Sequence, residues 1–208
     1  MATKTEATTS AAPSSIPISI TIPVIDISPY LASDPQQTKD VAAAIRAAAI
    51  APGFFQVIGH PITKDLRERL LAAVKAFYSL PREAKNRLHR NNSSCLRGYE
   101  TVGEQQLEEG FRDAKEGFMV GQELGGDDDD LLRFAQGPNQ WPAEDECPGF
   151  RAVFMEYFEA MRLFSRTMFR IVALSLDLEE AYFDDFAYGR DSTFDCICEF
   201  ALPEPVGC

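Results

Sequence analysis

The sequence has few of the residues that metal sites and nucleophilic sites need, and it has no long apolar run. Only two of its 208 residues are histidine, and only one is tryptophan. The most apolar stretch, residues 150–178, is interrupted by seven charged side chains, so we expect no membrane span. Residues 1–17 are rich in Ala, Thr and Ser and lack the apolar core of a signal peptide, which predicts a disordered tail and a cytoplasmic location.

Positive charge is also scarce. Lysine and arginine together number 20 against 32 acidic residues, which gives a formal net charge of -12. A phosphate backbone is bound mainly through cations that release its counterions, and no basic stripe is visible. We therefore expect no nucleic-acid partner.

Cysteine is present in an odd number, five residues, without a secretory signal. This pattern favours reduced thiols over a disulfide framework. Cys196 and Cys198 have Cys-x-Cys spacing and fall on one face of a predicted strand, but no second pair or nearby histidine completes a tetrahedral site. An independent metalloenzyme that uses this pair and one histidine stays open as a minor alternative.

Recognisable catalytic motifs are missing as well. The Gly-x-Ser-x-Gly motif of serine hydrolases is absent, and the glycines at 121–126 lack the lysine and the spacing of a phosphate loop. His60 follows a predicted strand, where a structural role is favoured, and His89 lies among cationic side chains that disfavour a bound metal ion. The sequence predicts no catalytic residue and no metal ligand.

The segments that are present alternate between short strands and helices. Residues 22–28 predict a strand, and Asp34 before Pro35 predicts the start of a helix that ends at Pro52-Gly53. Residues 54–59 predict a buried strand.

A second series of segments follows. Apolar residues spaced three and four apart predict a helix over 63–79, and Pro81 opens a short helix that runs to Leu88. Residues 91–148 predict loops with short strands. Residues 150–176 predict one long helix, whose packing face comprises Phe154, Tyr157, Met161, Phe164, Met168 and Ile171.

The order of these segments resembles a known family. IPVIDIS, APGFFQVIGHPI, AFYSLPREAKNRL, RGYE, NQWP and a long aromatic helix, in that order, are similar to the N-terminal region of the isopenicillin N synthase-like non-haem dioxygenases. The resemblance covers residues 22–206. It implies an α+β fold in which N-terminal helices and strands buttress a distorted jelly roll, a double-stranded β-helix, whose core is incomplete in this chain.

The resemblance also implies where a site would lie. The segment with Arg97 and Tyr99 would run near the substrate pocket, and the strand 194–201, with Cys198 and Phe200, would enter the barrel just before the first iron ligand. Relatives often carry Tyr-Pro-Pro before that ligand, whereas this chain has Phe200-Ala201-Leu202-Pro203, which lacks the hydroxyl group. The family's iron ligands, His-x-Asp and a distal His, do not follow in this chain.

We therefore expect the N-terminal portion of an oxidoreductase that uses Fe(II) and 2-oxoglutarate on a small-molecule metabolite, by hydroxylation, desaturation or ring closure. This chain alone is expected to be inactive and to bind no cofactor, with its catalytic half absent through truncation, splicing or an incomplete gene model. The alternative is a binding or regulatory module, derived from that family, that associates with a full-length relative.

Overall fold

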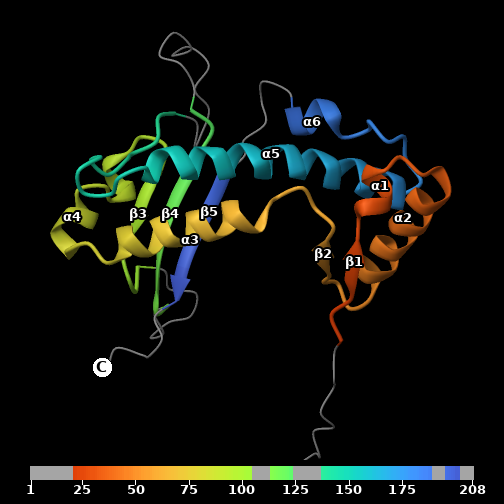
Figure 1. Ribbon diagram of the computed structural model, residues 1–208, viewed down its shortest axis with the longest axis horizontal. Coiled ribbons are helices and arrows are strands. Elements are labelled where there is room, and N and C mark those ends of the chain that lie inside the picture. The colour runs from red at the N-terminus through yellow and green to blue at the C-terminus, as the bar shows by residue number, and fades with distance from the viewer. Residues whose placement is uncertain (1–20, 105–112, 124–136, 189–194, 202–208) are drawn as a thin grey trace, which may run out of the picture.

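The computed structural model describes residues 21–104, 113–123, 137–188 and 195–201, and Figure 1 shows the course of the chain. Helices and strands both contribute, as expected for an α+β fold. In chain order the elements are β1 (Val24–Asp26), α1 (Ser28–Leu31), α2 (Pro35–Ile50), β2 (Gln56–Ile58), α3 (Lys64–Tyr78), α4 (Arg82–Asn86), the 3₁₀ turn η1 (Arg90–Asn92), β3 (Gly98–Glu100), β4 (Lys115–Gly121), α5 (Phe150–Ser175), α6 (Asp184–Tyr188) and β5 (Asp195–Ala201).

Side-chain caps begin the two middle-length helices, α2 and α3. The Asp34 carboxylate accepts hydrogen bonds from the backbone N–H groups of Gln36 and Gln37, and Pro35 occupies the first turn of α2. The Thr63 hydroxyl accepts the N–H of Leu66 at the start of α3. These caps satisfy donors that a helix leaves without partners at its N-terminus, so both helices begin where the sequence predicts.

Helix α5 contributes residues to two hydrophobic clusters, one along each half of the helix. Its first half packs with α3 and the three-stranded sheet, around Phe77, Phe118 and Phe154. Its second half packs with β1 and α2, around Ile45 and Ile171. Phe164 contacts both clusters, so the predicted packing face is confirmed, and Figure 1 shows the two groups of elements at opposite ends of α5.

The strands form two separate sheets in the described part of the chain. β1 and β2 pair in parallel, with Ile25 opposite Val57. β3, β4 and β5 form an antiparallel sheet in that order, with β4 in the centre. The strand predicted over 194–201 is therefore confirmed as β5, and it pairs with β4 over seven residues.

The strand predicted within residues 54–59 is confirmed as β2, but the prediction that this strand is buried is wrong. Phe54 is 70% exposed and Ile58 is 49% exposed. The reason is that β1 and β2 make only a two-stranded sheet, and the cluster on α2 and α5 covers only the face that carries Ile25. Periodicity cannot distinguish a strand buried on both faces from one buried on a single face when the run is this short.

The described residues bear on two further expectations, which concern the cysteine thiols and a membrane span. Cys95 and Cys147 are buried free thiols, as predicted, whereas the side chains of Cys196, Cys198 and Cys208 lie outside the described residues, as does the whole predicted tail 1–17. In the part of the chain that the structure describes, no helix is both long enough and apolar enough to cross a membrane.

Candidate functional site

Strand β4 presents different chemistry on its two faces. Side chains alternate along a strand, and those of Glu116, Phe118 and Val120 are buried toward α3, α4 and α5. The intervening positions on the other face include Gly117 and Gly121, which have no side chain. The second face of β4 therefore has room for groups that come from neighbouring segments.

Arg97 and Glu100 occupy the space above these glycines. A Cβ atom placed on Gly121 would overlap the guanidinium group of Arg97, and one placed on Gly117 would lie 3.3 Å from Oε2 of Glu100. Arg97 is 1% exposed and Glu100 is 7% exposed. A cation and a carboxylate are thus both buried along the face of β4 that points away from the helices.

The segment 139–140 fixes the backbone around this pair. The Gln140 side-chain amide donates to the carbonyl oxygens of Arg97, at 2.6 Å, and His89, at 3.1 Å. The Asn139 side chain accepts the N–H of Gly121 and donates to its carbonyl oxygen. Arg90 lies beside the pair, with Nη1 3.1 Å from Oε1 of Glu100. These contacts hold Arg97 and Glu100 in one position relative to the sheet.

Tyr99 lies on the opposite face, in a polar network beneath the helices. Its hydroxyl donates to Oε2 of Glu116 at 2.6 Å, and the Lys85 ammonium group donates to the same oxygen at 2.7 Å. Lys85 also donates to the Tyr78 carbonyl oxygen and lies over the Tyr99 ring. Burial, together with the hydrogen bond to Glu116, raises the pKa of Tyr99, so the hydroxyl stays protonated.

Glu104 joins His89 and Arg90 at the border of the site. Its Oε2 lies 3.1 Å from Nε2 of His89 and accepts the N–H of Thr101, while Oε1 accepts from Arg90. Burial alone would raise the pKa of Glu104, but the Thr101 N–H and the neighbouring His89 and Arg90 lower it below its ordinary value. The carboxylate is therefore ionised at neutral pH and anchors this border.

The structure describes the side chains of two of the four predicted pocket residues, Arg97 and Tyr99, and only the strand positions of the other two. Arg97 lies on the face away from the helices and Tyr99 lies on the helix face, so the structure separates these near neighbours. In the strand register, Cys198 is opposite Phe118 and Phe200 is opposite Glu116, but the side chains of β5 lie outside the described residues. Sequence reasoning missed Glu100 and the two glycines of β4, although glycines four apart in a strand share one face and signal room beside it.

The described ranges contain no group of three or more His, Cys, Asp or Glu side chains that could hold a metal ion. Both histidines have other surroundings. His60 packs its ring against Phe164, with 5.6 Å between ring centroids, and His89 contacts Glu104 and accepts the N–H of Asn91. An iron site with two histidines and one carboxylate therefore does not fit these residues.

Comparison with known proteins gives the site a context. Residues 22–144 match the sequence model of a family described as the N-terminal domain of the non-haem dioxygenase in morphine synthesis. The chain is 36% identical over 175 residues to the 2-oxoglutarate-Fe(II) type oxidoreductase hxnY of Emericella nidulans, covering 82% of this chain and 50% of that protein. It is 38% identical over 171 residues to the 2-oxoglutarate-dependent dioxygenase traH of Penicillium crustosum, covering 79% and 51%.

Solved structures share the fold. A full-length protein of Neurospora crassa, solved in complex with alpha-KG, superimposes with a TM-score of 0.68 at 26% identity, covering 82% of this chain and 52% of that one. The C-terminally truncated apo form of the same protein gives 0.70 at 25% identity, covering 91% and 66%. The chain spans about half the length of the curated relatives it matches.

Proposed function

The chain belongs to the isopenicillin N synthase-like family of Fe(II)- and 2-oxoglutarate-dependent non-haem dioxygenases, and from this premise we propose that it forms the N-terminal portion of an oxidoreductase acting on a small-molecule metabolite. In this proposal residues 22–206 are the dioxygenase N-terminal domain and include the start of the jelly roll. In the same proposal, residues other than 22–206 form the remainder of the jelly roll and provide the iron and 2-oxoglutarate sites.

The observation that carries the proposal is the two-sided sheet β3-β4-β5. Helices α3 and α5 cover one face, and the other face holds Arg97 and Glu100 over glycine backbone. Layered folds bury both faces of such a sheet, so the second face suits a further layer of strands and a pocket between the layers.

Fe(II) does not fit the residues that the structure describes, because no three-ligand cluster is present among them. No step of the reaction is therefore assigned to a metal held by these residues. The residues of this chain would instead shape the wall of the substrate pocket and keep it rigid.

The four predicted pocket residues have different roles in this proposal. Arg97 stays a pocket candidate on the strength of the family resemblance, with a guanidinium group suited to an acidic or carbonyl group of the substrate, although its side chain is only 1% exposed in this chain. Tyr99 positions β4 from behind through Glu116, without contact with the substrate. Cys198 and Phe200 stay pocket candidates on the strength of the family resemblance.

The experiment has two stages. First, the mass of the endogenous protein and the transcript beyond the Cys208 codon are determined. We expect a polypeptide heavier than 23.1 kDa, in which a His-x-Asp motif follows. Second, the longer polypeptide is produced and its Fe(II)-dependent conversion of 2-oxoglutarate to succinate is measured, with the 208-residue chain as matched control.

The longer form should be active and the 208-residue chain should not. A sole endogenous species of 23.1 kDa would overturn the proposal and favour the binding module instead. Iron-dependent turnover by the 208-residue chain would overturn the assignment of the iron site to another portion.

A further inference from the structure

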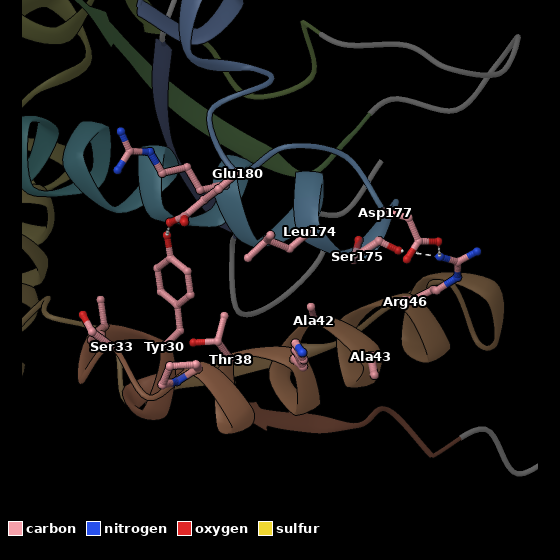
Figure 2. Close-up of a pocket in the computed structure, with 14 residues that line it drawn as sticks. Tyr30, Ser33, Thr38, Ala42, Ala43, Arg46, Leu174, Ser175, Asp177 and Glu180 are labelled. Carbon is pink, nitrogen blue, oxygen red and sulfur yellow. Dashed lines mark hydrogen bonds and ion pairs between the residues drawn. The ribbon is translucent and has the colours of Figure 1, made fainter.

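A second candidate site lies at the other end of the molecule from β3, β4 and β5. A groove of about 880 Å³ is lined by residues of α1, α2, the C-terminal end of α5 and the turn that follows α5. Figure 2 shows the residues that line it, and Figure 1 shows α2 at the end of α5 opposite the three-stranded sheet. The volume lies in the range of small-molecule sites, which is about 300 to 1,000 Å³.

One stripe of α2 forms the lower wall of the groove. Thr38, Lys39, Ala42, Ala43 and Arg46 follow one another at helical spacing and all line it. Lys39 and Arg46 are seven residues apart, which is about 10 Å along the helix axis. Small alanine side chains lie between the two cations, so the middle of the groove is open and apolar.

The opposite wall completes this arrangement. Leu174 faces the alanines across the groove, as Figure 2 shows, and the carbonyl oxygen of Ser175 accepts a hydrogen bond from Arg46 at 3.0 Å. Ala42 is 6% exposed, so the floor belongs to the hydrophobic contact between α2 and α5. An apolar ligand segment placed here would replace water on a mostly apolar surface.

The carboxylates of the groove are already engaged. Asp177 accepts from Arg46 at 2.6 Å, and Glu180 accepts the Tyr30 hydroxyl. Arg170 is bound through Nε and Nη2 to Asp184. These contacts fix both rims, and they balance the charge of Asp177 against that of Arg46 and the charge of Arg170 against that of Asp184.

Two sets of cationic donors are left for a ligand. Lys39 makes no ion pair with any residue that the structure describes. Arg46 uses only Nη1 in its contacts with Asp177 and Ser175, so the edge formed by Nε and Nη2 is available for a carboxylate.

From this pattern we propose that the groove binds a linear dicarboxylate. One carboxylate pairs with Lys39, the other pairs with the free edge of Arg46, and the methylene chain lies over Ala42, Ala43 and Leu174. The proposal needs neither iron nor the pocket beside Arg97, and it stands independently of the proposed function.

Isothermal titration calorimetry of the 208-residue protein with adipate, a six-carbon diacid, tests the proposal, and hexanoate is the monocarboxylate of equal length. We expect saturable binding of adipate and about twofold to fivefold weaker binding of hexanoate, since one charge pair is lost. Lys39→Ala should raise the Kd for adipate about twofold to fivefold for the same reason. Ala43→Leu should weaken binding by filling the groove without a change in charge, and both replacements introduce residues that favour a helix.

Lys64→Ala is the matched control, because Lys64 is an exposed lysine whose partner is Glu68 on α3. Its Kd for adipate should equal that of the unaltered protein. Absence of heat at millimolar adipate would overturn the proposal. Equal loss in Lys39→Ala and Lys64→Ala would also overturn it, because it would reveal unspecific attraction of anions, and equal Kd values for adipate and hexanoate would overturn the dicarboxylate assignment.

Discussion

Replacing Gly121 by alanine tests whether the Arg97 guanidinium lies where we describe it. The added methyl group would overlap three guanidinium atoms, and Arg97 is 1% exposed, so the side chain has no solvent into which it can turn. Overpacking a buried site costs about 1 to 3 kcal/mol, and displacing a buried charge from its surroundings adds to that cost. We expect Gly121→Ala to lower the free energy of unfolding by about 3 kcal/mol.

Gly117→Ala on the same strand face is the matched control. Neither glycine has a positive φ, so alanine is compatible with the backbone at both positions. The new Cβ at residue 117 would meet Glu100 at 3.3 Å, which a small shift relieves. Because alanine also restricts the unfolded chain, which favours folding by about 0.4 to 1 kcal/mol, this variant should unfold within about 1 kcal/mol of the unaltered protein.

Urea unfolding followed by tryptophan fluorescence measures both variants. Trp141 is the single tryptophan, its ring lies 6.4 Å from that of Phe118 on β4, and its Nε1 donates to Glu123. With a urea slope of about 2 kcal/mol/M, the expected loss for Gly121→Ala moves the midpoint down by about 1.5 M. A midpoint shift no larger than that of Gly117→Ala would show that the Arg97 guanidinium does not lie against Gly121.

Three further predictions concern other contacts. Glu116→Gln should destabilise the fold by about 3 kcal/mol, because it leaves the Lys85 ammonium group buried without its counter-charge. In urea unfolding, the double replacement Lys85→Met with Glu116→Gln should recover part of that loss. Additive losses of unfolding free energy would contradict this pairing. The lowered pKa of Glu104 means that its carboxylate stabilises the fold above its ordinary pKa of 4.5, and that this contribution disappears as the pH falls through the lower folded-state value. Glu104→Gln should therefore lose less stability than the unaltered protein between about pH 6 and about pH 3 in urea unfolding, and parallel pH profiles would count against the assignment. Asp34→Ala should lower the free energy of unfolding by about 1 kcal/mol through loss of the α2 cap, and an unchanged melting temperature would show that the cap contributes nothing.

The site shows how far local rules reach. Arg97 and Tyr99 are two residues apart in a segment that the family resemblance predicts to run near the substrate pocket, and their side chains lie on opposite faces of the sheet. Gly98 between them has a φ of 112°, a conformation that glycine adopts readily, and β3 begins at Gly98, so Arg97 precedes the strand. The alternation of side chains along a strand does not apply to a residue that precedes the strand. Spacing alone therefore could not predict that the side chains of Arg97 and Tyr99 lie on opposite faces.

Local sequence patterns were enough to predict α2, α3, α4 and α5, the Asp34 cap and the family, whereas they did not predict the short helices α1 and α6. Asp34 and Thr63 begin helices through contacts within three residues, and the apolar stripe of α5 follows from its period, so both depend on local chemistry alone. Three features depend instead on tertiary packing: Phe54 is exposed, Lys85 meets Glu116 across 31 positions, and Arg97 lies over Gly121. These features depend on which segments, distant in the sequence, pack together. The hydrophobic periodicity of a single segment contains no information on its packing partner.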